Sequence, residues 1–157
     1  MGVGTNKVDV GSLAPDFALP SQSGEVVSLK HFLRSRPVVL FFYPKDDSPG
    51  CTRQACAIRD DHEEFTELDA EVIGISSDPA ASHERFAKKH DLPFTLLSAA
   101  EGRVRRLYKV ASTFGLFPGR VTYVIDKEGV VRHVFSSQLG ITRHVEEALR
   151  ALRAIQT

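Results

Sequence analysis

The chain has 157 residues, 42% hydrophobic and 25% charged, which is typical of one soluble globular domain. Its 20 lysines and arginines balance 20 aspartates and glutamates, so no basic excess favours nucleic acid or an anionic membrane. Residues 1–9 read as a loose polar leader without a signal peptide's apolar core, and no run is long enough to span a bilayer. We expect a single domain over residues 1–157, in the reducing cytoplasm, with no nucleic-acid or membrane partner.

The first half of the chain begins with short apolar segments. Phe17–Leu19 and Val26–Leu29 flank Ser21–Gly24, whose small polar residues are typical of a turn, so we expect an N-terminal β-hairpin. Pro37 then opens Val38–Tyr43, a continuous run of β-branched, aliphatic and aromatic residues. Such a run is typical of a strand that is covered on both faces.

Similar apolar runs recur later and alternate with helical patterns. The runs that resemble strands are Val72–Ser76, Phe94–Leu97 and Val121–Ile125. The helical patterns lie at about 51–68, from Pro79 to about His90, and at 102–110. This alternation predicts an α/β fold with a central mixed β-sheet flanked by helices.

The end of the chain predicts a hairpin followed by a helix. Lys127–Gly129 is a tight turn that joins Val121–Asp126 to Val130–Phe135 as antiparallel strands, which makes the sheet mixed. Thr142 can cap a final amphipathic helix. The apolar face of that helix carries Val145, Leu149 and Leu152.

The two cysteines, Cys51 and Cys56, lie in the most informative part of the sequence. The loop from Pro44 to Gly50 starts at the carboxyl end of the strand at 38–43, where open α/β sheets place their active sites, and leads into a helix near Cys51. A cysteine there faces unpaired backbone N–H groups and the positive end of the helix dipole. Both favour the nucleophilic thiolate, so we expect Cys51 to be reactive at neutral pH.

The spacing of the two cysteines sets a mechanical condition. Five positions along one helix place their Cα atoms roughly 8–9 Å apart and about 140° around the axis. A disulfide needs Cα atoms within about 7 Å. If Cys51 and Cys56 form a disulfide, the first turns of the helix must therefore unwind.

Other interpretations of these residues stay open at this point. Both cysteines could be inert core residues. Cys51, Cys56 and His62 offer possible metal ligands, although a second pair of ligands is missing. A thioredoxin-type disulfide exchanger would carry C-x-x-C, and the spacing here is C-x₄-C. The histidines, including His83 and His90, match no metal motif, and we interpret them as surface residues.

The residues around Cys51 resemble the active-site loop of peroxiredoxins. The motif Pro44-x-x-x-Ser48-x-x-Cys51 is specific to that family, and Ala55-Cys56 in the same helix is typical of the subfamily called peroxiredoxin Q or bacterioferritin comigratory protein. Downstream, the segment from Phe117 to Asp126 is similar to the part of these proteins that carries the active-site arginine.

This resemblance extends over about residues 10–152 and implies a thioredoxin-like fold. It also implies roles for five residues: Cys51 as peroxidatic cysteine, Cys56 as resolving cysteine, Arg120 as the guanidinium beside the thiolate, Ser48 as hydroxyl donor, and Pro44 as shield of the pocket. Arginine keeps its charge at any working pH and offers several donors to a thiolate or a peroxide oxygen. Backbone N–H groups at the helix start can support charge on the leaving oxygen.

The implied reaction is the reduction of hydrogen peroxide and organic hydroperoxides. Cys51 becomes a sulfenic acid, Cys56 forms an intramolecular Cys51–Cys56 disulfide with it, and thioredoxin or a glutaredoxin-type dithiol reduces that bond. The resemblance implies no metal, haem or flavin cofactor, and a monomer. The alternative is a redox sensor, in which oxidation of Cys51 switches a partner surface without many turnovers.

Two positions depart from the family pattern. Ser48 stands where threonine is commoner, which keeps the hydroxyl but loses a methyl group that restricts its rotamers. Ala99, in Ser98-Ala99-Ala100, stands where relatives often carry an acid, so any role of that acid is in doubt here.

Overall fold

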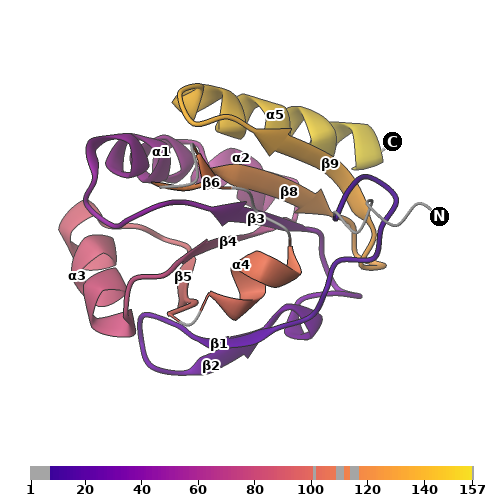
Figure 1. Ribbon diagram of the computed structural model, residues 1–157. Helices are drawn as coiled ribbons and strands as arrows, with labels where there is room; N and C mark the ends of the chain where they lie inside the picture. Colours follow the sequence, from indigo (N-terminus) through magenta and orange to yellow (C-terminus); the bar gives the residue numbers. More distant parts are fainter. Residues whose placement is uncertain (1–7, 101, 109–111, 114–116, 157) are drawn as a thin grey trace.

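A computed structural model of the chain describes residues 8–100, 102–108, 112–113 and 117–156 (Figure 1). Its centre is a five-stranded sheet in the order β5-β4-β3-β8-β9. These strands are β3 (Val38–Phe42), β4 (Glu71–Ser76), β5 (Thr95–Ser98), β8 (Val121–Ile125) and β9 (Val131–Ser136). β3, β4 and β5 pair in parallel, whereas β8 pairs antiparallel with β3 and β9. The predicted mixed sheet is confirmed.

The central strand β3 is buried along its whole length, as its apolar run predicted. Successive side chains of a strand point to opposite faces, so β3 feeds two separate hydrophobic clusters. Val39 and Phe41 belong to one cluster, and Val38, Leu40 and Phe42 belong to the other. A strand covered on both faces has no polar face, which explains why the run is continuous.

Helices cover one face of the sheet, and a hairpin with a short helix covers the other (Figure 1). The first layer contains α1 (Pro49–Asp60), α2 (His62–Glu67) and α5 (Ile141–Gln156), with α3 (Ala80–His90) beside β5. The opposite layer contains β1 (Ala18–Pro20), β2 (Val26–Ser28), the 3-10 turn η2 (Leu29–His31) and α4 (Arg103–Leu107). The short strands β6 (Ser112–Thr113) and β7 (Phe117–Pro118) form a third, two-stranded sheet.

Both predicted hairpins are present. β1 and β2 pair antiparallel, with Leu19 opposite Val27, and this hairpin is linked to the main sheet by a bridge between Ser21 and Leu97. The turn between β8 and β9 contains Gly129 with a φ of 86°, a backbone conformation that favours glycine.

Two helix predictions differ from the structure. The helix expected over 51–68 is divided at Asp61, which has φ −101° and ψ 11° and ends α1 before α2 begins. Aspartate favours caps and turns over helix interiors, because its side chain competes for nearby backbone groups. The final helix begins at Ile141, so Thr142 lies in its first turn and is not its cap. The N–H of Gly140, just before the helix, donates to the Ser137 hydroxyl at 2.9 Å.

Some predicted features lie partly outside the described residues. Of the leader expected at 1–9, only Val8 and Asp9 are described, and Val8 packs partly buried against the hairpin-side cluster. The helix expected over 102–110 is described as far as residue 108, and it corresponds to α4. Within the described ranges, none of the helices combines the length and apolar composition that crossing a membrane requires.

Candidate active site

Cys51 lies in the first turn of α1, at the carboxyl end of β3. Ser48 precedes the helix in an extended conformation, and Pro49 takes its first position, where proline's fixed φ and missing N–H are favourable. Cys51 is the third helical residue and only 2% exposed. The first N–H groups of a helix have no partner within it, so the sulfur lies at the positive end of the α1 dipole. The predicted helix entry is confirmed.

Arg120, the residue just before β8, contacts the sulfur. Its Nη1 lies 3.4 Å from Cys51 Sγ and donates to Gln54 Oε1 at 2.6 Å. The pairing of β3 with β8 explains the meeting of such distant residues, because Phe42 is opposite Val121 and Arg120 directly precedes that pair. Arg120 is 6% exposed, so its charge acts on the sulfur with little screening by water.

We call Cys51, Gln54 and Arg120 the thiol cluster. Sequence reasoning missed Gln54, although it lies three positions after Cys51 and therefore on the same helix face. Among the described residues, Arg120 Nε and Gln54 Nε2 are buried and have no hydrogen-bond partner. The cluster thus holds two unused donors beside a nucleophilic sulfur.

Gly50 allows Arg120 to come this close. A Cβ atom at position 50 would lie 3.0 Å from Arg120 Nη2 and 3.5 Å from Ile141 Cδ1. The first distance is shorter than ordinary van der Waals contact. Glycine at this position therefore leaves room for the Arg120 guanidinium, and a larger residue would need it to shift by a few tenths of an ångström.

The backbone that carries Arg120 is held by α5. The carbonyl of Arg120 accepts the Ser137 N–H at 3.2 Å, and the Ser137 carbonyl accepts a hydrogen bond from His144 Nε2 at 2.8 Å. His144 Nδ1 is 2.8 Å from the Thr122 hydroxyl. Burial lowers the pKa of His144, and the nearby charge of Arg120 lowers it further. His144 is therefore neutral and adds no positive charge to the site.

Cys56 lies on the same uninterrupted helix as Cys51 and is partly buried. Both cysteines are free thiols in the structure. Helix geometry separates their Cα atoms by more than a disulfide allows. The condition derived from the spacing therefore applies to this fold: α1 must open before the two sulfurs can bond.

Ser48 and Pro44 occupy the loop before α1. The Ser48 hydroxyl donates to the Lys45 carbonyl at 2.9 Å, which leaves its oxygen able to accept a further hydrogen bond. Pro44 is half-buried in the bend that follows Tyr43. The hydroxyl-donor role of Ser48 and the shielding role of Pro44 stay predictions.

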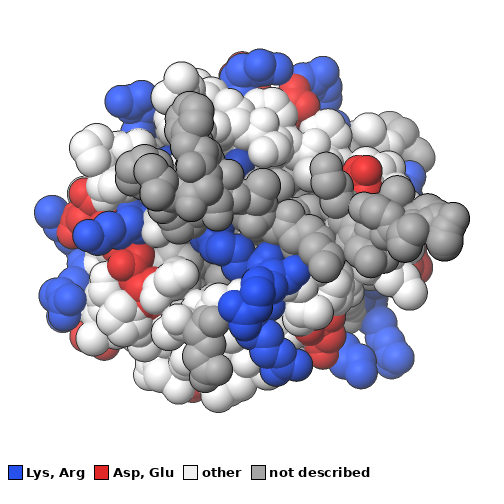
Figure 2. Space-filling model, in the orientation of Figure 1, with Lys and Arg blue, Asp and Glu red and all other residues white. Residues whose placement is uncertain are grey.

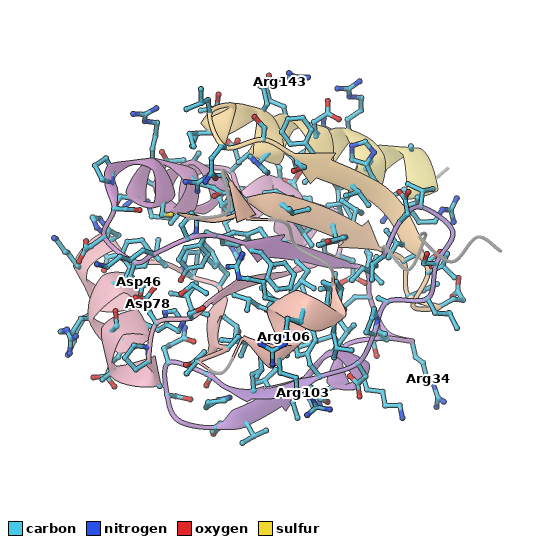
Figure 3. All side chains as sticks on the ribbon, viewed as in Figure 1. Arg34, Asp46, Asp78, Arg103, Arg106 and Arg143 are labelled. Atoms are coloured by element: carbon cyan, nitrogen blue, oxygen red, sulfur yellow. The ribbon has the colours of Figure 1, made fainter. Side chains whose placement is uncertain are left out.

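A second buried polar group holds this loop, and we call Tyr43, Asp46, Ser82 and His83 the loop anchor. Asp46 Oδ1 accepts from the Tyr43 hydroxyl at 2.6 Å, and Asp46 Oδ2 accepts from the Ser82 hydroxyl at 2.7 Å. His83 Nδ1 is also 2.7 Å from Asp46 Oδ2. Figure 3 labels Asp46 where the loop meets α3. The surface position predicted for His83 is wrong, because this side chain is 0% exposed.

The hydrogen bonds of the loop anchor determine the charge of Asp46. Burial alone would raise the pKa of Asp46, but hydrogen bonds from His83, Tyr43 and Ser82 outweigh it and lower the pKa below its ordinary value. An ionised carboxylate only accepts, so His83 Nδ1 must donate to it. His83 Nε2 donates to the Leu97 carbonyl at 3.0 Å. Both ring nitrogens of His83 thus have a polar partner, and the side chain links Asp46 to β5.

Helix α3 also holds the far end of α1. Arg59 Nη1 donates to the His90 carbonyl at 2.8 Å, and Lys89 pairs with Asp47 at 3.3 Å. The buried contacts of Asp46 and the bond from Arg59 thus hold the two ends of the segment that contains both cysteines, and the exposed pair of Lys89 with Asp47 adds little. No motif marked these residues, because each one alone looks like an ordinary surface charge.

The comparisons with known proteins agree with this geometry. Residues 10–134 match the AhpC/TSA family. A chloroplastic peroxiredoxin Q of Oryza sativa subsp. japonica is 52% identical over 150 residues, which are 95% of this chain and 69% of that protein. This chain belongs to the peroxiredoxin Q family. Chloroplastic peroxiredoxin Q of Triticum aestivum is 50% identical over 153 residues, covering 97% of this chain and 70% of the wheat protein. The peroxiredoxin is therefore a thiol-dependent peroxidase that uses hydroperoxides and a thiol reductant.

Solved structures confirm the thioredoxin-like peroxiredoxin fold. Peroxidoxin BcpB from Mycobacterium tuberculosis superposes with a TM-score of 0.89 at 39% identity, covering 96% of this chain and 99% of that one. Bacterioferritin comigratory protein from Xanthomonas campestris superposes with a TM-score of 0.85 at 26% identity. Its structures include a trapped intermediate and ligand complexes that concern alkyl peroxide reduction. That match covers 95% of this peroxiredoxin and 99% of the other chain.

The expected cytoplasmic location is contradicted by these relatives, because the peroxiredoxin Q proteins of rice and wheat are chloroplastic. The expectation rested on the absence of a signal peptide's apolar core in residues 1–9. An apolar core is not the feature that marks a plastid transit peptide, so its absence carries no information about a plastid location.

Proposed function

We propose that this peroxiredoxin is a single-domain enzyme in which Cys51 attacks hydrogen peroxide or an organic hydroperoxide and Cys56 resolves the product within the same chain. One observation carries the proposal: Arg120 Nη1 lies 3.4 Å from Cys51 Sγ at the start of a helix that also carries Cys56. A fixed positive charge and the helix dipole both favour the thiolate over the thiol.

In the first step the Cys51 thiolate attacks the terminal oxygen of the hydroperoxide. The S–O bond forms as the O–O bond breaks, the sulfur is oxidised to a sulfenic acid, and the alkoxide or hydroxide takes a proton and leaves as an alcohol or water. The free donors of Arg120 and Gln54 can stabilise the charge that moves onto the oxygens. Ser48, whose oxygen can still accept, and Pro44 at the loop entrance complete the proposed site.

In the second step α1 opens at its start and the Cys56 thiolate attacks the Cys51 sulfur. The Cys51–Cys56 disulfide forms, and the sulfenic oxygen leaves as water after taking a proton. Opening is inexpensive at a helix terminus next to a surface loop, where local unfolding costs least. The contacts of Asp46 and Arg59 with α3 confine the opening to the segment between them.

In the third step an external dithiol, thioredoxin or a glutaredoxin-type protein, reduces the disulfide. Its first thiolate attacks one sulfur of the pair, and its second thiol completes the exchange, so both chain cysteines return as thiols. Cys56 is already partly exposed on α1, which favours attack there. We also propose that the enzyme acts as a monomer without nucleic-acid or membrane partners, consistent with its net charge of zero.

Two cysteine variants test the proposal. Cys51→Ser should abolish peroxide consumption while the protein stays folded, and continued turnover at a comparable rate would refute the assignment of Cys51. In Cys56→Ser, one equivalent of peroxide should leave a sulfenic acid at Cys51, and excess peroxide should convert it to sulfinic acid. Mass spectrometry of the oxidised wild-type peptide should show the Cys51–Cys56 bond, whereas a Cys51-linked dimer with free Cys56 would overturn intramolecular resolution.

Hydrogen exchange tests the opening of the helix. In the oxidised wild-type protein, amides from about Thr52 to Ala57 should exchange faster than in the reduced protein, because an intact helix is incompatible with the disulfide. In Cys56→Ser treated with one equivalent of peroxide, the same amides should stay protected. Equal protection in reduced and disulfide-bonded wild-type protein would contradict the proposed unwinding.

A further inference from the structure

We infer that Arg105 is a positioning residue of the peroxidase site, whose guanidinium fixes the loop that leads to Cys51 relative to the segment that carries Arg120. The inference rests on the proposed roles of Cys51 and Arg120. Arg105 belongs to α4, on the opposite face of the sheet from α1, and no sequence motif marks it.

The guanidinium joins two backbone segments that are distant in sequence. Arg105 Nη2 donates to the Tyr43 carbonyl at 3.1 Å, and Arg105 Nη1 donates to the Gly119 carbonyl at 3.1 Å. Tyr43 is the last residue before the loop to Cys51, and Gly119 directly precedes Arg120. Because a guanidinium is planar and rigid, its two donors set the separation of the carbonyls they bind.

The sheet cannot supply this link. The hydrogen-bonded ladder between β3 and β8 ends at the pair Phe42 and Val121. The N–H of Tyr43, one residue further, donates to the Ile75 carbonyl of β4 at 3.0 Å, away from β8. Just beyond the last pair of the ladder, Arg105 links the Tyr43 carbonyl to the Gly119 carbonyl.

The surroundings of Arg105 keep its side chain in one place. Its Cζ lies 5.6 Å from the centroid of the Phe42 ring, a distance at which a cation interacts favourably with the ring face. Burial lowers the pKa of Arg105, and the negative charge of the Cys51 thiolate acts in the opposite direction. A guanidinium keeps its charge at any working pH, so Arg105 stays positively charged.

The neighbouring arginines of α4 provide a matched control. Basic side chains gather over α4 on the face shown in Figure 2, and Figure 3 labels Arg103 and Arg106 there. Arg103 is exposed on the same short helix and carries the same charge as Arg105. It therefore reports the effect of losing one arginine from this patch.

The test compares the rate of Cys51 oxidation by hydrogen peroxide in single variants by stopped flow. Arg105→Met should lower the rate about tenfold, since a misplacement of about 1 Å can cost up to about 10²-fold. Arg105→Lys should also be slow, because an ammonium keeps the charge but cannot hold two carbonyls in a fixed fork. Arg103→Met should react like wild type. Full rescue by Arg105→Lys, or an equal loss in Arg103→Met, would overturn the inference.

A second measurement separates positioning from loss of structure or of thiolate. In a Cys56→Ser background and at a pH high enough to ionise Cys51 fully in every protein, alkylation by iodoacetamide no longer depends on how Arg120 shifts the thiolate population, so its rate in Arg105→Lys should stay within about twofold of the protein with Arg105. A parallel fall in alkylation and peroxide rates would overturn the inference.

A double-mutant cycle tests whether Arg105 acts through Arg120. In an Arg120→Met background, Arg105→Met should have almost no further effect, because the group it positions is already missing. The same tenfold factor in both backgrounds would mean that the two residues act independently, against the inference. Peroxide turnover by the wild-type protein, measured in the same series, tests the proposed function by itself. A failure of the proposed function can therefore be distinguished from a failure of the inference about Arg105.

Discussion

The thiol cluster and the loop anchor are both buried polar groups next to the loop between Tyr43 and Ser48, yet they use their hydrogen bonds differently. In the loop anchor, both oxygens of Asp46 and both nitrogens of His83 are bonded. In the thiol cluster, two donors have no partner among the described residues. An unpaired buried donor costs about 1–3 kcal/mol, so the loop anchor contributes more to stability, and the free donors of the thiol cluster fit the role proposed for them in binding a substrate oxygen.

The largest expected effect comes from breaking the loop anchor. Asp46→Asn removes the carboxylate that is hydrogen-bonded to three buried or partly buried side chains, which should lower the free energy of unfolding by about 3 kcal/mol. Urea denaturation measures the change. Asp47→Asn is the matched control: its exposed pair with Lys89 should contribute no more than about 1 kcal/mol. Equal losses in both variants would mean that the anchor does not stabilise the loop.

Removal of Arg120 should affect reactivity more than stability. Arg120→Ala should slow the oxidation of Cys51 by about 10²-fold, the usual cost of losing a charge-stabilising donor. Less of Cys51 should also be thiolate at neutral pH, because a positive charge beside the sulfur is gone. Stopped-flow oxidation and thiolate absorbance measure the two effects. The control, Arg132→Ala on β9, should change neither, and unchanged values in Arg120→Ala would place Arg120 outside the reaction.

A smaller perturbation adds one methyl group next to the thiol cluster and leaves all three of its side chains in place. In Gly50→Ala, the new methyl group would lie 3.0 Å from Arg120 Nη2 and displace it. The rate of peroxide reduction should fall about tenfold, by the same dependence on position. Stability should not fall with it, because alanine favours a helix over glycine by about 1 kcal/mol. An unchanged rate would show that Arg120 can shift without consequence.

The smallest expected effect is a change with pH in the stability that Asp46 of the loop anchor contributes. The ordinary pKa of aspartate is about 3.9, and that of Asp46 is lowered in the folded protein. The stability it contributes is therefore fully present above about pH 4 and is lost as the pH falls through the lower folded value. Urea denaturation at decreasing pH should show a steeper loss for wild type than for Asp46→Asn. Parallel curves would contradict the assignment.

The sequence predicted the features whose physical cause is local. The apolar run of β3, the proline and glycine before α1 and the position of Cys51 in the first turn all follow from neighbouring residues. Arg120 could be assigned from the resemblance to peroxiredoxins, not from its own surroundings. Its contact with Cys51 depends on the pairing of β3 with β8, which local patterns do not determine.

Apart from Gln54, the missed residues share one property, which is that each acts through a contact between distant segments. Asp46 and His83 are 37 positions apart and look like ordinary polar residues of a loop and a helix. Arg105 binds two backbone carbonyls, and a carbonyl leaves no trace in a sequence pattern. Gln54 was the exception, since its spacing from Cys51 could have identified it.

If Cys51 and Cys56 act as proposed, the intact helix that separates them sets a limit on how much peroxide the enzyme tolerates. In that mechanism, resolution of the sulfenic acid is first order, because Cys56 lies in the same helix as Cys51 and α1 must open before the two sulfurs meet. Over-oxidation of the same sulfur is second order, because it needs another molecule of peroxide. Dividing the first-order rate constant of helix opening by the second-order rate constant of over-oxidation gives a peroxide concentration. Above that concentration the sulfenic acid is over-oxidised faster than it is resolved, and the enzyme is inactivated. Substitutions that merely strengthen the first turns of α1 would therefore make the enzyme more sensitive to its own substrate.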